Sequence, residues 1–439
     1  MPMTMTASLM ERLREIVGGD ALAPEAEMPR YAVDGVVPKA VVFPSSEEQV
    51  SAVLAMADRD GWTVAPRGNG SLMELGGTPE RVDVVVALGK LRQPIEHSPD
   101  DLTVTAGAGT TLAELQQTLA QAGQWLPLDP PMAHQRTLGG ILATNLAGPL
   151  SLSHGTARDW VIGMRVASPD GTITKSGGKV VKNVTGFDVG KVHLGALGTL
   201  GVIVEASLKV APLPAKDATL TAAFASLEDA LKASMSLAGI PGAPQAVEVA
   251  VSGDGGCTAY TRLMGSAASV ERRLRDARSC LSQAGAGQVE VMPETEATQA
   301  WKRLADFGWD APLPGDSILL RLGCVPSHVM ETATVLRDVT QKYKYEAQIV
   351  AGVGRGLLRC ILASAAGRDA GAVAVVVDEL RGRVASLGGY VVVERCNGDL
   401  KSRVDVWGSP GEGLSLMRRL KEQMDPKHIL NPGRFVGGI

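Results

Sequence analysis

Two glycine-rich stretches contain the residues best suited to bind a phosphorylated ligand. The first, Pro66-Arg67-Gly68-Asn69-Gly70-Ser71, directly follows residues 62–65, which have the composition of a β-strand. Glycine tolerates positive φ, so consecutive backbone N–H groups of such a loop can point inward and bind an anion. Arg67 would add positive charge and Ser71 a hydroxyl donor. The loop is a candidate pyrophosphate site, and its residues alone fit a plain surface turn equally well.

The second stretch runs from Asp129 to Gly155 and consists mainly of small residues, glycine and proline. Long irregular segments inside a compact domain are usually either functional or disordered. Leu138, Ile141 and Leu142 need burial, which argues against disorder. A backbone of small residues wrapped around a flat cofactor explains this composition better than an unoccupied loop.

Other common catalytic motifs are absent or incomplete. The chain has no G-x-x-x-x-G-K-[ST], no H-E-x-x-H and no G-x-S-x-G sequence, which disfavours a P-loop nucleotide site, a local zinc site and a serine hydrolase. Gly107 and Gly109 imitate the start of a dinucleotide fingerprint, but Leu112 occupies the position of its third glycine. We interpret that segment as a tight turn before a helix.

The composition excludes several kinds of partner. The 439 residues carry a net charge of −4 and only 4% aromatic residues, which gives no support for nucleic-acid binding. The five cysteines are widely spaced, so we expect neither a disulfide framework nor an iron–sulfur cluster held by this chain alone. There is no apolar signal region and no run of about 20 apolar residues. We therefore expect a cytoplasmic protein, with any membrane association made through a partner.

The periodicity of the N-terminal half predicts short strands alternating with capped helices. Ser45 and Glu48 form a candidate capping box, as do Thr111 and Glu114. Between them residues 82–88 are almost entirely apolar, as expected for a strand buried on both faces. Residues 126–156 show little regular pattern. The predicted strands cover residues 41–43, 62–65, 82–88, 102–106, 161–168, 171–176 and 202–210.

The C-terminal half predicts an antiparallel sheet with helices on one face, of the ferredoxin-like type. Its candidate helices cover residues 227–237, 270–283, 329–342 and 370–386, and its candidate strands cover residues 247–251, 318–322, 357–362 and 390–394. A last helix, residues 414–424, is stopped by Asp425-Pro426. We divide the chain into an N-terminal lead-in (1–35), a nucleotide-binding domain (36–213), a cap domain (214–400) and a C-terminal segment that returns to the nucleotide-binding domain (401–439).

The order of these motifs resembles the p-cresol methylhydroxylase and vanillyl-alcohol oxidase flavoprotein superfamily. The resemblance is carried by the following segments: Val42-Phe43-Pro44-Ser45, the 66–71 loop, Thr137-Leu138-Gly139-Gly140, Gly198-Thr199-Leu200-Gly201-Val202-Ile203 and Asn431-Pro432-Gly433-Arg434. Within the superfamily the chain resembles the FAD-binding E subunits of bacterial glycolate oxidase. That similarity is carried by Leu126-Pro127-Leu128-Asp129-Pro130-Pro131, Leu146-Ala147-Gly148-Pro149, Ala157-Arg158-Asp159 and residues 182–188.

The resemblance implies an α+β fold with a PCMH-type, two-subdomain FAD-binding domain and a ferredoxin-like cap. The 66–71 loop would hold the pyrophosphate and the second stretch would border the flavin ring. No histidine lies in the loop, so the FAD should be non-covalent and dissociable. The implied cofactor-binding residues are Pro66, Arg67, Gly68, Asn69, Gly70, Ser71, Pro130, Thr137, Leu138, Gly139, Gly140, Thr144, Asn145, Gly148, Gly155, Arg158, Gly201, Val202, Ile203 and Asn431.

The chain departs from relatives that oxidise 2-hydroxy acids at one important place. Those relatives carry a His-x-Gly-Asp-Gly-Asn-x-His strand and a later Glu-His-Gly turn, which hold a divalent metal and a base. The matching positions here are residues 352–359 and 394–396, where only Glu394 is retained. Val and Arg are not metal ligands, so we predict no metal site. The catalytic residues stay unknown, and the weak candidates are Arg355, Arg359, Glu394 and Arg395, whose alternative role is in ion pairs on a sheet face or subunit interface.

Three functions fit these residues. The first is a FAD-binding subunit of a glycolate oxidase or 2-hydroxy acid dehydrogenase complex, with a catalytic flavoprotein and an iron–sulfur subunit as partners. The second is a stand-alone flavin-dependent oxidoreductase of a small hydroxy acid or alcohol. The third is a scaffold that has lost FAD, and the intact 66–71 loop argues against it.

Overall fold

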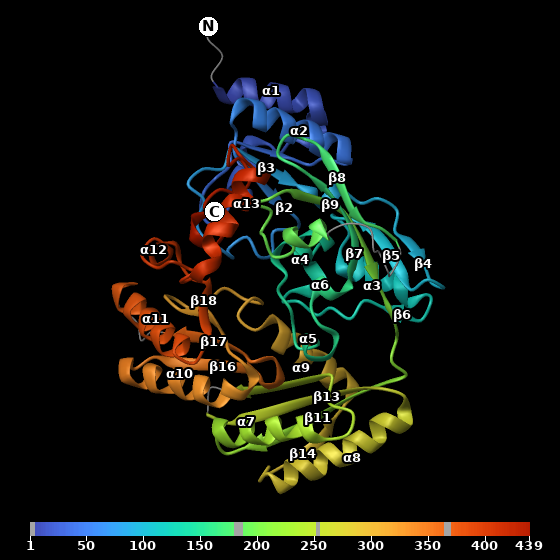
Figure 1. Cartoon of the computed structure of the whole chain (residues 1–439), viewed down its shortest axis with the longest axis vertical. Helices are drawn as coiled ribbons and strands as arrows, with labels where there is room; N and C mark the ends of the chain where they lie inside the picture. Colours follow the sequence, from blue (N-terminus) through green and yellow to red (C-terminus); the bar gives the residue numbers. More distant parts are fainter. Residues whose placement is uncertain (1–4, 180–187, 252–254, 364–369) are drawn as a thin grey trace.

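The computed structural model describes residues 5–179, 188–251, 255–363 and 370–439. Figure 1 shows two parts, which we call the FAD part and the cap. The FAD part contains the N-terminal half of the chain and helix α13 (Leu414–Met424), and the cap contains the segments between them. No helix among the described residues is long and apolar enough to cross a membrane.

The first subdomain of the FAD part is a parallel sheet in the order β1-β3-β2. Helix α2 crosses from β1 to β2, and α1 packs on α2. The α2 N-cap is Ser46, whose hydroxyl accepts from Gln49 N, so the predicted Ser45 cap is wrong by one residue. Ser45 instead donates to the Gln49 side chain. The elements are α1 (Met5–Val17), β1 (Ala40–Val42), α2 (Glu47–Asp60), β2 (Val64–Arg67) and β3 (Val84–Ala87).

The second subdomain is an antiparallel sheet in the order β4-β5-β9-β7-β8, as far as the chain is described. The capping box of Thr111 and Glu114 is confirmed at the start of α3. The expectation of little regular structure in residues 126–156 is wrong, because helices of one or two turns form where Thr137 caps α4. The elements are β4 (Glu96–Ser98), β5 (Thr103–Gly107), α3 (Leu112–Ala120), β6 (Gln124–Trp125), α4 (Leu138–Thr144), α5 (Ser151–His154), α6 (Ala157–Trp160), β7 (Val161–Ala167), β8 (Ile173–Gly177), β9 (Val202–Lys209) and β10 (Ala211–Pro212).

The described cap residues form an eight-stranded antiparallel sheet in the order β14-β11-β13-β12-β16-β17-β15-β18. The four predicted helices and four predicted strands are all present, and four further strands and α9 complete the cap. Their bounds are β11 (Lys216–Phe224), α7 (Leu227–Ser236), β12 (Ala246–Val251), β13 (Cys257–Gly265), α8 (Ala267–Gln283), β14 (Val289–Met292), α9 (Glu294–Asp306), β15 (Ile318–Gly323), α10 (Val329–Tyr343), β16 (Glu346–Gly352), β17 (Leu357–Ala363), α11 (Ala370–Ala385) and β18 (Tyr390–Arg395).

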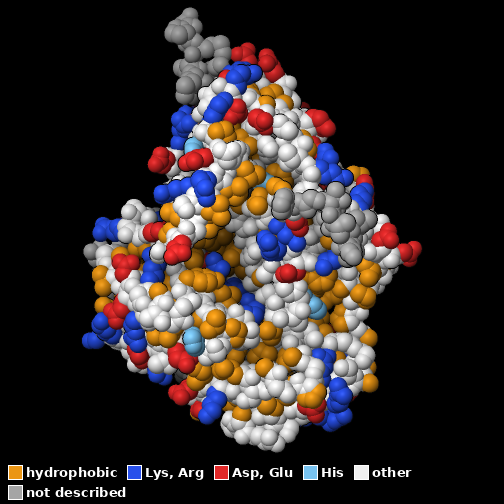
Figure 2. Space-filling view, viewed as in Figure 1, with side chains coloured by type: hydrophobic (Ala, Val, Ile, Leu, Met, Phe, Trp, Pro, Cys, Tyr) orange, Lys and Arg blue, Asp and Glu red, His pale blue; other side chains and the backbone are white. Residues whose placement is uncertain are grey.

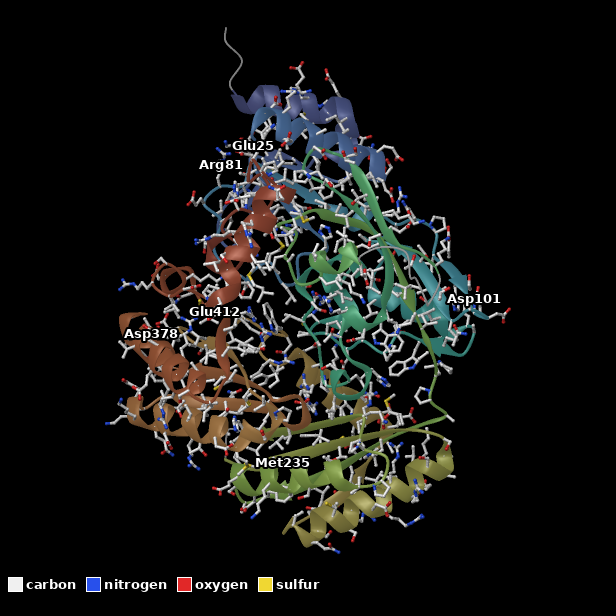
Figure 3. All side chains as sticks on the ribbon, in the orientation of Figure 1. Glu25, Arg81, Asp101, Met235, Asp378 and Glu412 are labelled. Carbon is white, nitrogen blue, oxygen red and sulfur yellow. The ribbon has the colours of Figure 1, made fainter. Side chains whose placement is uncertain are left out.

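Helices cover both faces of the cap sheet, so the prediction of helices on one face is wrong. Helices α7, α8, α10 and α11 form the main cap core with side chains such as Val247 and Val249 of β12. Met235 of α7 marks this outer side in Figure 3. On the opposite face Ala246 packs with Trp301 of α9, whose indole N–H donates to Thr219 Oγ1 at 2.7 Å. Successive strand residues face opposite sides, which explains this division.

The C-terminal segment contacts both parts. The short helix α12 (Gly398–Lys401) packs on α11 of the cap, and its Lys401 pairs with Asp34 of the FAD part at 2.8 Å. After α13, Leu430 forms a parallel bridge with Val64 of β2. An apolar cluster joins the FAD part to the cap through residues such as Leu197 and Trp309. Figure 2 shows the surface hollowed between the two parts, with basic and hydrophobic side chains at its edge.

Candidate functional site

The two glycine-rich stretches lie against each other. The 66–71 loop follows β2, and Gly70 has a φ of 81°, in the left-handed region. A Cβ on Gly68 would lie 2.2 Å from Thr137 Oγ1, so the loop backbone approaches the second stretch closely there. Asn69 Nδ2 donates to Gln135 O at 2.8 Å. Stretches about 70 residues apart in sequence therefore form one cleft.

Helix α4 turns a small-residue face toward this cleft. Leu138 and Ile141 are buried in the core of the FAD part. Thr137 begins the helix by accepting a hydrogen bond from Gly140 N at 3.3 Å, and Asn145 ends it in the left-handed conformation. A seven-residue helix with one apolar face leaves Gly140 and Thr144 beside the loop.

Two cavities of about 80 and 50 Å³ flank the loop and are lined by most of the predicted cofactor residues. The smaller lies deep in the FAD part, against Val202 and Ile203. The predicted residues lining the larger cavity are Pro66, Gly68, Asn69, Gly70, Ser71, Thr137, Gly140, Thr144 and Asn431. Those lining the smaller cavity are Pro66, Arg67, Gly68, Thr137, Gly139, Gly140, Gly201, Val202 and Ile203.

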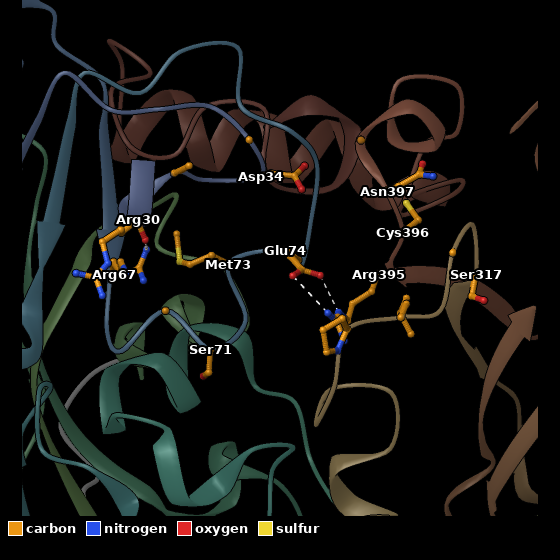
Figure 4. A pocket seen from close by; sticks show the side chains of 17 residues that line it. Arg30, Asp34, Arg67, Ser71, Met73, Glu74, Ser317, Arg395, Cys396 and Asn397 are labelled. Carbon is orange, nitrogen blue, oxygen red and sulfur yellow. Dashed lines mark hydrogen bonds and ion pairs between the residues drawn. The ribbon is translucent and has the colours of Figure 1, made fainter. Parts of the chain in front are cut away.

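A third cavity of about 550 Å³ extends from the loop to the cap. Figure 4 shows Arg30 and Arg67 at one end of it, and Glu74 and Arg395 across it. The Arg67 guanidinium lies 5.0 Å from the centre of the Tyr31 ring, and burial lowers the pKa of Arg67. Glu74 pairs with Arg395 at 2.7 Å and connects the FAD part to the cap. One end of the cavity is therefore cationic, which suits a phosphorylated ligand.

The other predicted cofactor residues do not line these three cavities. Leu138 is buried in the core. A Cβ on Gly148 would lie 1.8 Å from Asp129 O, and one on Gly155 would lie 2.3 Å from Asp159 Oδ2, so both glycines have local packing roles. Their assignment as cofactor contacts stays a prediction, as does that of Pro130, Asn145 and Arg158.

The four catalytic candidates are all engaged in ion pairs or hydrogen bonds on the cap face that points toward the FAD part. Arg355 pairs with Glu248, and Glu394 pairs with Arg321 at 2.8 Å. Arg359 donates to Ala305 O at 2.8 Å. Arg395 lines the 550 Å³ cavity while it pairs with Glu74. Glu248 and Arg321 were not predicted as partners of these candidates, because the sequence does not show which residues of neighbouring strands lie side by side.

Buried polar atoms without a partner test whether the larger loop cavity suits a cofactor. Among the described residues, Nη1 of Arg136, Oδ1 of Asn431 and Nε of Arg434 are all buried and lack a hydrogen-bond partner. All three residues line the 80 Å³ cavity. Buried polar groups are nearly always hydrogen-bonded, so these atoms fit a polar ligand in the cleft. The residues present therefore suit the phosphate, ribityl and ring polar atoms of FAD.

Sequence reasoning missed Arg136 and Arg434. Each is the only lysine or arginine of a stretch already singled out for other reasons, Arg136 directly before Thr137 and Arg434 at the end of Asn431-Pro432-Gly433. The sequence signal that could have indicated them as cofactor-site residues is a lone arginine among small or apolar residues. No three His, Cys, Asp or Glu side chains in the described ranges are arranged to hold a metal ion.

Asp129 is expected to make stability fall as the pH rises. Desolvation raises the pKa of its carboxyl, which accepts from Leu150 N, to about 7. Between about pH 4 and 7 the folded chain holds this proton and the unfolded chain releases it. The contribution of Asp129 to the free energy of unfolding is therefore full below that window and decreases by about 1.4 kcal/mol per pH unit through it. Urea titrations at several pH values should show a flatter profile for Asp129→Asn, and an unchanged profile would contradict the raised pKa.

The fold and the cleft together define a PCMH-type flavoprotein. Solved structures support this fold class: p-cresol methylhydroxylase has a TM-score of 0.77 over 97% of this chain and 96% of its own, at 17% identity. An alkyldihydroxyacetonephosphate synthase has a TM-score of 0.76 over 99% of this chain and 87% of its own, at 18% identity. The FAD binding domain family matches residues 38–177, and the family of FAD linked oxidases, C-terminal domain, matches residues 213–435. The chain belongs to the FAD-linked oxidase family and is a FAD-dependent oxidoreductase.

Two curated relatives match over most of the chain and a third matches over a shorter segment. Glycolate oxidase subunit GlcD of Bacillus subtilis is 25% identical over 427 residues, 91% of this chain and 89% of the relative. The mitochondrial D-lactate dehydrogenase [cytochrome] of Arabidopsis thaliana is 26% identical over 91% of this chain and 74% of the relative. Glycolate oxidase subunit GlcE of Escherichia coli is 40% identical over 121 residues, 27% of this chain and 35% of the relative. GlcE is thus the more similar relative locally, and GlcD matches over the greater length.

Proposed function

We propose that this chain is the FAD-carrying subunit of a glycolate oxidase-type complex that oxidises a small 2-hydroxy acid. In that complex it relays electrons for, or supports, a catalytic flavoprotein partner and an iron–sulfur subunit. The similarity to the two glycolate oxidase subunits supports this class of complex.

The observation that carries the proposal is the cap face opposite the cleft. A 2-hydroxy acid needs an available cation to bind its carboxylate close to the flavin. On this face Arg355 and Arg321 are already paired with Glu248 and Glu394, and Arg359 is buried against Ala305 O. The positions that match the metal-binding strand, residues 352–359, supply no carboxylate or imidazole. These contacts favour a chain whose substrate chemistry is performed by a partner.

Apolar packing between the two parts supports the same conclusion. Leu72 and Leu197 of the FAD part form one cluster with Trp309 and Leu319 of the cap. Trp309 also donates its indole N–H to Glu394 Oε2 at 3.3 Å. A substrate placed between the cap sheet and the cleft would have to displace this cluster and break the pair of Glu394 with Arg321.

The second candidate, a stand-alone oxidoreductase, is favoured by the nearly full-length similarity to D-lactate dehydrogenase and D-2-hydroxyglutarate dehydrogenase. An anaerobic absorption spectrum separates the two candidates. The FAD-loaded chain should keep its oxidised flavin band after addition of glycolate, D-lactate or D-2-hydroxyglutarate, and should lose it with dithionite. We expect the hydroxy acid to bleach the band only when the co-purified partner subunits are added. Bleaching of the isolated chain by a hydroxy acid would establish the second candidate instead.

A further inference from the structure

The most unusual charge in the described part of the FAD domain is the guanidinium of Arg136. Arg136 is 2% exposed, and no carboxylate among the described residues lies within ion-pair distance of it. Nη2 donates to Gly140 O at 2.6 Å and to Thr144 Oγ1, whereas the buried Nη1 has no hydrogen-bond partner. Burying a charge without a counter-ion costs several kcal/mol, so a chain retains such a group where a ligand supplies the missing charge.

The position of Arg136 indicates which end of the cofactor it faces. The smaller loop cavity is lined by Val202, Ile203 and Ala108, deep in the core of the FAD part. The larger one is lined by Arg136 and by Leu197, which packs against Trp309 of the cap. The flavin ring must lie at the end from which electrons can leave toward a substrate or partner, and that is the end near the cap. Gly68 to Ser71 of the 66–71 loop also line this cavity, so we place Arg136 between that loop and the cap, on the side where the ring would lie.

We propose that Arg136 binds the electron-rich N1–C2 carbonyl edge of the flavin ring and stabilises the reduced cofactor over the oxidised one. When two electrons and one proton are taken up, with the proton at N5, the reduced ring keeps one negative charge shared by N1 and the C2 carbonyl oxygen. A buried guanidinium next to this edge gains more interaction energy after reduction than before it. This inference rests on the proposed function only in using FAD as the cofactor.

The geometry supports binding rather than simple filling of space. Two residues of α4 orient the guanidinium through Nη2, so Nη1 is held in one direction instead of being free to rotate. Burial without a counter-ion lowers the pKa of Arg136 to about 9, which shows how little the protein itself compensates the charge. The neighbouring Arg434, whose pKa burial lowers to about 10, donates to the backbone carbonyls of Met73 and Leu75 and so connects distant segments, whereas the hydrogen bonds of Arg136 reach only the adjacent helix α4.

The test compares Arg136→Met and Arg136→Gln with a surface control, Arg59→Met. Arg59 is 66% exposed at its side chain and pairs only with the adjacent Asp60 among the described residues. The dissociation constants of oxidised and reduced FAD are measured by titration of the apoprotein, and the midpoint potential by dithionite titration with a reference dye. Loss of Arg136 should weaken reduced FAD about tenfold more than oxidised FAD, which for a two-electron couple lowers the potential by about 30 mV. Arg59→Met should change neither quantity.

A second readout separates ligand binding from a structural role. Arg136→Met removes the cost of a buried unpaired charge and also loses the hydrogen bonds to Gly140 O and Thr144 Oγ1, so the melting temperature of the apoprotein should change little. The rise in melting temperature on adding FAD should be smaller in this variant. If Arg136→Met lowered the affinities for oxidised and reduced FAD equally and also lowered the affinity for ADP, Arg136 would be assigned to the pyrophosphate and the proposal would be overturned. Unchanged titrations would do the same, whereas a wild-type chain that binds no FAD would refute the proposed function.

Discussion

Gly68→Ala is expected to lower the affinity for FAD at least about tenfold while leaving the fold intact. The new Cβ would lie 2.2 Å from Thr137 Oγ1, far inside normal contact distance, and 3.3 Å from Thr137 Cβ, which is a tight contact. Either the 66–71 loop retreats or Thr137 rotates and stops capping α4, where a lost cap costs about 1 kcal/mol. Both movements change the cleft in which the loop and α4 meet. FAD titration of the apoprotein and flavin content after purification measure the effect.

Two variants make this result specific to the cleft. Gly239→Ala adds the same methyl group where nothing lies within 4 Å, and it should bind FAD like the wild type. Thr137→Ala removes the atom closest to the new methyl group, so the double variant with Gly68→Ala should lose less affinity than the two single losses combined. If Gly68→Ala and Gly239→Ala bound FAD equally well, the 66–71 loop would not be the cofactor site.

The FAD part was predictable because its pattern is local. Strands β1, β2 and β3 are short apolar runs, and the capping box of Thr111 and Glu114 indicates the start of α3. Helices α4, α5 and α6 were not predicted, because four to seven residues are too few to display a helical period. The one-residue error at the α2 cap arose because Ser45 and Ser46 are adjacent candidates and only the fold selects between them.

The fold class of the cap could be predicted from sequence, but the face and the partners of individual strand residues could not. Alternation in β12 sets Val247 and Val249 against the outer core, but sequence cannot say that Ala246 would face another helix. Helix α9 was missed, although its Trp301 closes the inner face. Only family resemblance singled out the four arginine and glutamate candidates, and their contacts depend on strand register, which the sequence does not show.

Within the cleft, the residues found from sequence are those whose conformational properties are unusual. Glycines such as Gly68 and Gly70 can be recognised from sequence, because clustered glycines after a strand indicate a backbone that needs positive φ or close packing. Arg136 and Arg434 were missed because a single arginine is ordinarily a surface residue, and only its burial in three dimensions makes it exceptional. The backbone scaffold of a cofactor site is thus easier to predict than the charges that tune it.

The largest effect on stability is expected from Lys421→Ala, at about 3–5 kcal/mol. Lys421 is 1% exposed at its side chain, and its ammonium donates to Asp425 Oδ2 at 2.6 Å, Thr199 O at 2.8 Å and Leu430 O at 2.9 Å. Burial lowers the pKa of Lys421, while Asp425 opposes that shift. Truncation would leave the Asp425 carboxylate buried without its cation and two carbonyl groups without a donor.

The same substitution should also loosen the cofactor cleft, because the three contacts of Lys421 hold together segments that border it. Thr199 precedes Gly201 at the small cavity, and Leu430 precedes Asn431 at the larger one. We therefore expect Lys421→Ala to lose FAD as well as stability, as followed by urea unfolding of the apoprotein and by FAD titration. Lys427→Ala is the matched control, since its ion pair with Asp58 is half exposed and is worth at most about 1 kcal/mol. Equal destabilisation by the two alanine variants would show that the C-terminal segment does not depend on the buried pair.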